Sequence, residues 1–391
     1  MEAAEEVAHA DLDTLQSLVD KSLLRHREDR FWMLETIREF ATERLEERGE
    51  AEELRRRHAE VFLALAEEAE PDLRRDSLEW ADRLEGEHDN MRAALDWLET
   101  SGDSQLRLRL AGALMRFWYL KSHLLEGQGR LEGALRADSS PTAARGKALN
   151  GAAVMALNLG EIPKARLRAE EALALHRTLG DAWGTAYSGF MVANALNEGG
   201  DQASAQPLLE ESIRMFREIG EENLALVATS NLAIVIGDLG DRERERELHT
   251  DILRRSRAMG NERLEAGALA ELALLARDDG QLGDAGSMLR DAIRIEHRRG
   301  DVLSVVINLG RLASVLARGG RNREATQLLS SSEALTEGLG ASVPFWAEKR
   351  NAETRTIIRE HLDEAAFAEV WEQGRTLTVD EAVALALESL D

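Results

Sequence analysis

The sequence predicts an all-α solenoid, a row of stacked helix pairs, and three observations support this prediction. Glycine recurs every 20 residues, at Gly160, Gly180, Gly200, Gly220, Gly240, Gly260, Gly280, Gly300, Gly320 and Gly340. Alanine recurs every 40 residues, at Ala153, Ala193, Ala233, Ala273 and Ala313. The composition, with 43% hydrophobic and 31% charged residues, is typical of a largely helical protein. A fixed period of this size indicates a repeat architecture.

The repeating residues have a physical role in such an array. A small side chain lets the first helix of each pair approach its neighbour closely, and a glycine closes each helix in a left-handed conformation. An aspartate follows several of the glycines and is expected to cap the next helix, at Asp181, Asp201, Asp241 and Asp301. Glu245 interrupts the second alanine column, formed by Ala165, Ala205, Ala285 and Ala325, and this puts close packing of the third repeat in question.

The N-terminal region has a different organisation. Leucines at three- and four-residue spacing predict a helix from residue 12 that ends near residues 21–23. Residues 24–34 are expected to form a β-hairpin around Glu28-Asp29, with a solvated loop as the alternative. A helix over residues 35–48 follows, and Gly49 is placed to end it.

Further helices connect this region to the array and close its far end. They are expected at residues 51–70, ending at Pro71, and at 78–99, 106–121 and 124–137. After the array, Ser342–Pro344 break the period, Gly374 is expected to end a helix over 362–371, and Thr378 with Glu381 forms a capping box. The predicted parts are a partial winged helix (1–49), bridging helices (50–101), an atypical first helix pair (102–141), five 40-residue repeats (142–341) and C-terminal capping helices (342–391).

Two stretches of the sequence resemble known families. The series Ala153, Gly160, Ala165, Ala172 has the spacing of a tetratricopeptide repeat, here longer than the usual unit of about 34 residues. Residues 18–24 (LVDKSLL) and 31–41 (FWMLETIREFA) resemble the region after the nucleotide-binding core of bacterial STAND ATPases, the LuxR-like and NB-ARC-like signalling proteins. The resemblance implies a winged-helix remnant followed by a right-handed superhelix, and a nucleotide-binding domain N-terminal to this chain or separate from it.

Composition and motifs exclude several functions. The net charge of −24 opposes direct nucleic-acid binding, and the absence of cysteine excludes disulfides and thiolate sites. Neither a signal peptide nor a membrane span is expected, which favours a cytoplasmic protein. Gly146-Lys147 imitates a phosphate loop, but Pro141 stands where its first glycine should be. The nine histidines do not pair at helical ligand spacing. We therefore expect no catalytic residue, no cofactor and no metal.

An array of helix pairs offers a concave groove lined by the first helix of each pair. The tetratricopeptide resemblance implies that this groove carries Lys147, Asn150, Tyr187, Phe190, Asn194, Asn197, Asn231, Glu271 and Arg311. Asparagine is a poor helix former, so Asn150, Asn194 and Asn231 in mid-helix need a reason. Their amides either hydrogen-bond a ligand or bond other helices of the array.

The function expected is a non-enzymatic one. The chain is interpreted as the sensor or protein-interaction module of a STAND-type signalling or transcription regulator, with a protein or peptide partner in the groove. The alternative is an array that senses a small molecule, such as a sugar or metabolite, and regulates a linked or separate ATPase. The ligand, the oligomeric state and the completeness of the chain are left open by the sequence.

Overall fold

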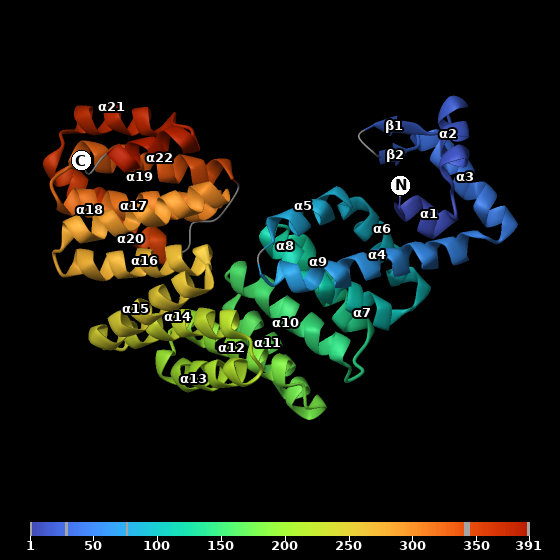
Figure 1. Ribbon diagram of the computed structural model, residues 1–391, viewed down its shortest axis with the longest axis horizontal. Coiled ribbons are helices and arrows are strands. Elements are labelled where there is room, and N and C mark those ends of the chain that lie inside the picture. The colour runs from blue at the N-terminus through green and yellow to red at the C-terminus, as the bar shows by residue number, and fades with distance from the viewer. Residues whose placement is uncertain (1, 28–29, 76, 340–344, 389–391) are drawn as a thin grey trace. The chain divides into compact units, whose positions relative to one another are not determined.

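The computed structural model describes residues 2–27, 30–75, 77–339 and 345–388. Within these residues the chain forms 22 helices and one two-stranded sheet, so the predicted fold class is confirmed (Figure 1). The helices of this described part are all too short or too polar to cross a lipid bilayer. The chain divides into two compact units, Met1–Gly199 and Gly200–Asp391.

The N-terminal part of the first unit contains the predicted hairpin. Its elements are α1 (Glu2–Ala8), α2 (Leu12–Asp20), β1 (Arg25–Arg27), β2 (Arg30–Trp32) and α3 (Glu35–Arg48). The two strands pair antiparallel, and the rings of His26 and Phe31 stack across them at 4.6 Å. Gly49 ends α3 with a φ of 69°, as predicted. The turn expected at Glu28-Asp29 lies outside the described residues.

Six helices connect the hairpin to the repeats. They are α4 (Ala51–Leu73), α5 (Leu78–Gly86), α6 (His88–Ser101), α7 (Ser104–Ala113), α8 (Met115–Leu120) and α9 (Leu124–Ala137). Helices predicted as continuous are interrupted at Glu87 and Leu114, where the backbone turns. The prediction that Pro71 ends its helix is wrong, because α4 continues to Leu73. A proline this close to a C-terminus removes only one hydrogen bond of the helix.

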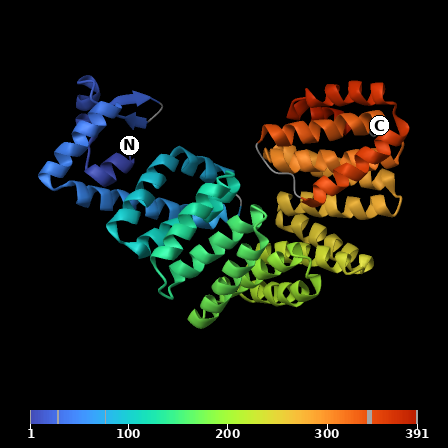
Figure 2. The ribbon, with the colours of Figure 1, turned by 180° about the vertical axis from the view of Figure 1, so that it is seen from behind.

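The helix pairs of the array occur where the glycine period places them. In the first unit these helices are α10 (Ala143–Asn158), α11 (Ile162–Leu179) and α12 (Ala182–Glu198). In the second unit they are α13 (Gln202–Glu218), α14 (Glu222–Asp238), α15 (Arg242–Met259), α16 (Glu262–Asp278), α17 (Leu282–Arg299), α18 (Val302–Arg318) and α19 (Asn322–Gly338). Within each unit consecutive helices of the array pack on each other, as Figures 1 and 2 show from opposite sides for α16 to α19.

The junctions between these helices have the predicted chemistry. The periodic glycines from Gly160 to Gly320 all have positive φ, between 65° and 98°, and Gly340 lies outside the described residues. Each of the four predicted aspartate caps accepts a hydrogen bond from the backbone N–H three residues later, at 2.9 to 3.2 Å. The first alanine column, from Ala153 to Ala313, is fully buried. The recurring glycine, aspartate and alanine thus determine where the helices end and how closely neighbouring helices approach.

The third repeat keeps its packing despite the glutamate in its alanine column. Glu245 of α15 is buried, with 8% of its surface exposed. Its carboxylate occupies the place where a Cβ would stand on Gly237 of α14. The missing side chain at Gly237 therefore makes room for the longer side chain at Glu245.

Three further helices complete the second unit: α20 (Phe345–His361), α21 (Glu364–Arg375) and α22 (Val379–Glu388). The prediction that Gly374 ends a helix is wrong, because Gly374 lies inside α21 and is buried against Gln327 and Ser330 of α19. Its role is close approach, since a Cβ there would overlap both neighbours. The capping box is confirmed: the backbone N–H of Thr378 donates to Glu381 Oε2 at 2.8 Å. The break expected at Ser342–Pro344 lies outside the described residues.

Two glycine-to-alanine substitutions in the second unit should have opposite effects on stability. Gly260 has a φ of 65° and open space around it, so alanine there is penalised by the backbone alone, by about 1 kcal/mol. Gly267 is exposed inside α16, also with nothing within 4 Å of an added Cβ, so Gly267→Ala should stabilise by about 0.5–1 kcal/mol. Urea unfolding of both variants measures this difference, and shifts of the same sign would contradict the proposed role of the periodic glycines.

Candidate functional site

A row of five side chains follows one face of α12 in the first unit: Trp183, Tyr187, Phe190, Asn194 and Asn197. We call it the α12 row. Spacings of three and four residues place these side chains on one face of a helix. The rings of Trp183 and Tyr187 stack with centroids 5.0 Å apart and planes at 9°. Tyr187 and Phe190 are buried, whereas Asn194 and Asn197 are half-buried. Trp183 is half-buried as well, so the two ends of the row are partly accessible and its middle is buried.

Asn197 carries a buried polar atom without a partner, as several other residues of the described part do, Asn322 among them. Its Oδ1 is buried and has no hydrogen-bond partner among the described residues. A buried acceptor without a donor costs about 1–3 kcal/mol, so such atoms are rare in folded proteins. The residue as a whole is half-buried, so a turn of its carboxamide toward solvent would let this oxygen accept a hydrogen bond from a bound molecule.

On α10, the two predicted groove residues are engaged inside the first unit. Asn150 is 2% exposed, and Ser188 of α12 donates a hydrogen bond to its Oδ1 at 2.8 Å. Its Nδ2 lies 3.4 Å from Nε2 of His176 on α11. Asn150 thus has the inter-helix role that the sequence left open. Lys147 forms an ion pair with Glu70 of α4.

The C-terminal end of α4 reaches the first helices of two repeats. Glu70 pairs with Lys147 of α10, and the guanidinium of Arg74 lies over the ring of Trp183 on α12, 4.2 Å from its centroid. A cation above an indole face is attracted by the ring quadrupole. The bridging helix therefore contacts the aromatic end of the α12 row.

In the second unit, three predicted groove residues occupy one column of the repeats. Asn231, Glu271 and Arg311 lie 40 residues apart on α14, α16 and α18. The structure brings the last two together: Arg311 Nη2 donates to Glu271 Oε1 at 2.7 Å, and Arg311 is 8% exposed. The charges of Arg311 and Glu271 both act on Arg350 of α20, and burial lowers the pKa of Arg350 to about 10. Glu271 and Arg311 are therefore part of a polar cluster within the unit.

A second buried acid stands near this cluster. Glu296 of α17 is 6% exposed, and its Oε2 accepts a hydrogen bond from Nδ2 of Asn308 at 2.7 Å. Burial raises the pKa of Glu296 to about 7, and the nearby Asp301 carboxylate acts in the same direction. Arg311 and Arg299 oppose this effect without overcoming it. The protonation of this side chain therefore changes near neutral pH.

Several of these residues were missed by the sequence reasoning. Ser188 and His176 bond Asn150, and Arg74 covers Trp183, yet none belongs to a recognisable motif. The sequence contained a usable signal for one contact only, between two residues that were predicted separately. Glu271 and Arg311 carry opposite charges at the same position of consecutive repeats, so their contact could have been predicted from the 40-residue period.

Comparison with known proteins gives a partial relative and a fold. No family model matches the chain. It is 33% identical over 183 residues to proteins described as candidate HTH-type transcriptional regulators of Mycobacterium bovis and Mycobacterium tuberculosis. The match covers 44% of this chain and 21% of each relative, so the chain spans about a fifth of the length of these relatives.

Among solved structures, a Rap protein complexed with competence and sporulation factor is similar with a TM-score of 0.50 and 12% identity. The alignment covers 78% of this chain and 99% of the Rap chain. A Pyrococcus horikoshii STAND protein with a tetratricopeptide repeat sensor aligns over 95% of this chain and 62% of its own, with 13% identity and a TM-score of 0.45. The fold is that of a tetratricopeptide-like repeat protein.

Replacing Glu296 with glutamine should change how the stability depends on pH. The folded protein holds the proton of Glu296 more tightly than the unfolded chain, so this group's stabilising contribution is complete below about pH 4.5 and is lost as pH rises through 7. Glu296→Gln keeps the acceptor for Asn308 and should stabilise the protein at pH 8 by up to about 3 kcal/mol. Urea unfolding at pH 5 and pH 8 measures the effect, with exposed Glu353→Gln as control. An equal change at both pH values would contradict a buried acid that titrates near 7.

Proposed function

We propose that the chain is a non-enzymatic protein-interaction module of a bacterial STAND-type signalling or transcription regulator. It works in the cytoplasm and binds a protein or an extended peptide along the first helices of its repeats. The binding governs a nucleotide-binding domain that is N-terminal to these residues or on a separate polypeptide.

The observation that carries this proposal is the carboxamide end of the α12 row. Asn194 and Asn197 are half-buried one turn apart, and the Oδ1 of Asn197 has no hydrogen-bond donor among the described residues. A carboxamide both donates and accepts hydrogen bonds, which matches the alternating N–H and C=O groups of an extended peptide. A peptide N–H bonded to Asn197 Oδ1 would remove the cost of leaving that oxygen unpaired.

The relatives support the regulatory part of the proposal. The chain shares 33% identity over 183 residues with much longer proteins described as candidate HTH-type transcriptional regulators. The Rap protein, which has a similar fold, is described in complex with competence and sporulation factor. Both findings favour a repeat module that passes a binding event to another part of a regulator.

The proposal is tested with peptides selected from a random display library on the purified chain. Binding of a selected peptide should weaken about 10-fold in Asn197→Ala and in Asn194→Ala, as expected for the loss of one hydrogen bond from a desolvated site. The free Asn197→Ala variant should be as stable as the parent or more stable, because an unpaired buried oxygen is removed. Fluorescence polarisation gives the affinity, and thermal unfolding gives the stability.

Gln206→Ala is the matched control, because Gln206 presents a carboxamide on the second helix α13, where it bonds Glu210 at 3.0 Å. Peptide affinity should be unchanged in this variant. Peptides that bind the Asn194/Asn197 double variant as tightly as the parent would contradict the assigned face. A metabolite that binds saturably at these asparagines when no peptide does would overturn the peptide assignment, and nucleotide hydrolysis by the pure chain would overturn the non-enzymatic role.

A further inference from the structure

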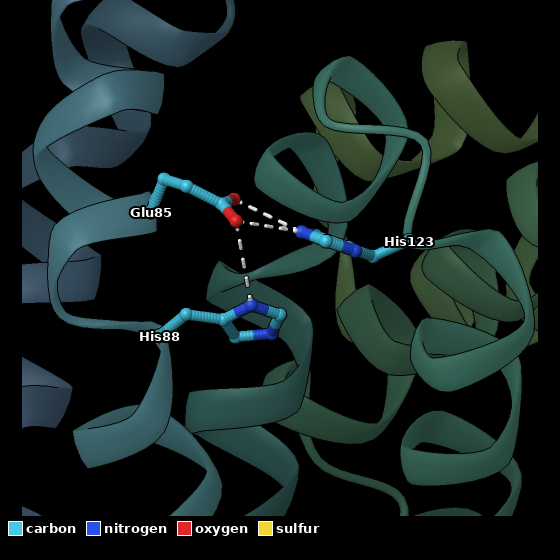
Figure 3. A group of neighbouring side chains, drawn as sticks. All are labelled: Glu85, His88 and His123. Atoms are coloured by element: carbon cyan, nitrogen blue, oxygen red, sulfur yellow. Dashed lines mark hydrogen bonds and ion pairs between the residues drawn. The ribbon is translucent and has the colours of Figure 1, made fainter. Parts of the chain in front are cut away.

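Three potential metal ligands meet in the bridging helices of the first unit, outside the face proposed for binding. Figure 3 shows the side chains of Glu85, His88 and His123 pointing toward one another. Each offers one ligand atom, and these atoms all lie within 4.8 Å of one another. His123 Nε2 is 2.9 Å from Glu85 Oε2, and His88 Nδ1 is 4.0 Å from Glu85 Oε1.

The backbone fixes where these side chains start. Glu85 lies in the last turn of α5, and His88 is the first residue of α6, directly after the turn at Glu87. His123 precedes α9, where its backbone N–H donates to the carbonyl of Trp118 at 2.8 Å. The three ligands therefore come from two chain segments, the α5–α6 corner and the start of α9.

The two imidazole rings are held close together by packing. Their centroids are 4.4 Å apart, and the ring of His88 meets the edge of Phe117 at 5.0 Å. His88 is 5% exposed, whereas Glu85 is exposed. The His88 side of the group is thus buried, and the Glu85 side is open to solvent.

A supporting carboxylate stands behind His88. Glu126 Oε1 lies 3.3 Å from His88 Nε2, and Arg92 donates to both oxygens of Glu126 at 2.8 and 2.6 Å. Metal-binding histidines commonly direct their second nitrogen at a carboxylate, which fixes the tautomer and the ring. The Nε2 of His88 lies within ion-pair distance of Glu126 without forming a hydrogen bond. When Nε2 carries the proton, the lone pair of His88 Nδ1 is on the side of Glu85 and His123.

An ion pair between Glu85 and His123 accounts for only part of this arrangement. It does not explain the orientation of His88. The Nδ1 of His88 faces the Glu85 carboxylate from 4.0 Å, which is beyond hydrogen-bond distance, and the Glu126 carboxylate lies 3.3 Å from its Nε2. Donor atoms around a tetrahedral zinc ion lie about 3.3 Å apart, given metal–ligand distances of about 2.0–2.2 Å. Since the three ligand atoms lie within 4.8 Å of one another, their separations need to shorten by at most about 1.5 Å to reach that geometry.

We infer that Glu85, His88 and His123 bind one divalent zinc ion, which fastens the α5–α6 corner to the start of α9. Two histidines and one carboxylate are a known zinc ligand set, in which water occupies the fourth position. The exposed side of Glu85 leaves room for that water. Borderline nitrogen ligands favour zinc over magnesium and calcium, which prefer oxygen.

Zinc titration of the metal-free full chain, in competition with a chromogenic chelator at pH 7.5, tests the inference. One zinc ion per chain should bind, and His123→Ala and Glu85→Gln should each weaken it at least 10-fold. His361→Ala is the control, because His361 is an exposed histidine in α20 whose Nδ1 lies 2.9 Å from the backbone carbonyl of Ile357. Glu126→Gln should weaken zinc about 10-fold without removing a ligand.

Cobalt substitution provides a second measurement. Co²⁺ in a four-coordinate site absorbs visible light strongly, so the parent and the His361→Ala variant should give this spectrum and the His123→Ala variant should not. His123 is only partly buried, and circular dichroism of each variant verifies that it is folded. The absence of saturable zinc binding by the parent would overturn the inference. So would equal zinc affinity in the parent, His123→Ala and Glu85→Gln proteins.

Discussion

Close approach of neighbouring helices is the constraint on which the repeat array depends. The first alanine column, from Ala153 to Ala313, has essentially no exposed surface in any repeat. Because these side chains end at Cβ, the facing backbones come near enough for the surrounding leucines and valines to be buried between them. Each repeat packs mainly on its neighbours. An oversized side chain at one position must therefore be accommodated by the helices next to it. The pairing of buried Glu245 with Gly237 is one local solution to such an error.

The same constraint determines where polar side chains can go. In first helices that lie this close, buried polar side chains face nearly equivalent positions of the next repeat. The observed hydrogen bonds therefore join residues about 40 positions apart. Asn150 bonds Ser188 across 38 residues, and Arg311 bonds Glu271 across 40. A buried polar group is tolerated when it has a partner, which these pairs provide. Asn197 Oδ1 departs from this rule, as does the Oδ1 of Asn322; what distinguishes Asn197 is its half-buried place beside Asn194 on a first helix.

The sequence predicted those features whose cause lies within a few residues of the chain. The glycine junctions, the aspartate caps, the Thr378–Glu381 box and the hairpin each depend on local backbone geometry, so the residues alone identify them. Gly374 was misread because close packing against α19 places a glycine inside a helix. Pro71 was misread because a proline is tolerated in the last turn of α4. His88 begins α6 and His123, 35 residues later, precedes α9, so no spacing rule for a single helix could pair them. The sequence therefore predicted which helix face carries the candidate site, the first helices of the repeats, but not which side chains contact one another there.

The bridging helices have a mechanical consequence for the proposed function. Arg74 and Glu70, at the end of α4, touch Trp183 and Lys147 on the first helices of two repeats. A ligand that extends along the α12 row from Asn197 to Trp183 would compete for the same aromatic surface as Arg74. Its binding energy would then differ between arrangements of α4 that keep or release this contact. A difference of that kind is the thermodynamic requirement for a ligand to shift a conformational equilibrium. Since α1 and α3 pack on α4, such a shift acts on the N-terminal segment, which is where the STAND resemblance expects the nucleotide-binding domain to be attached.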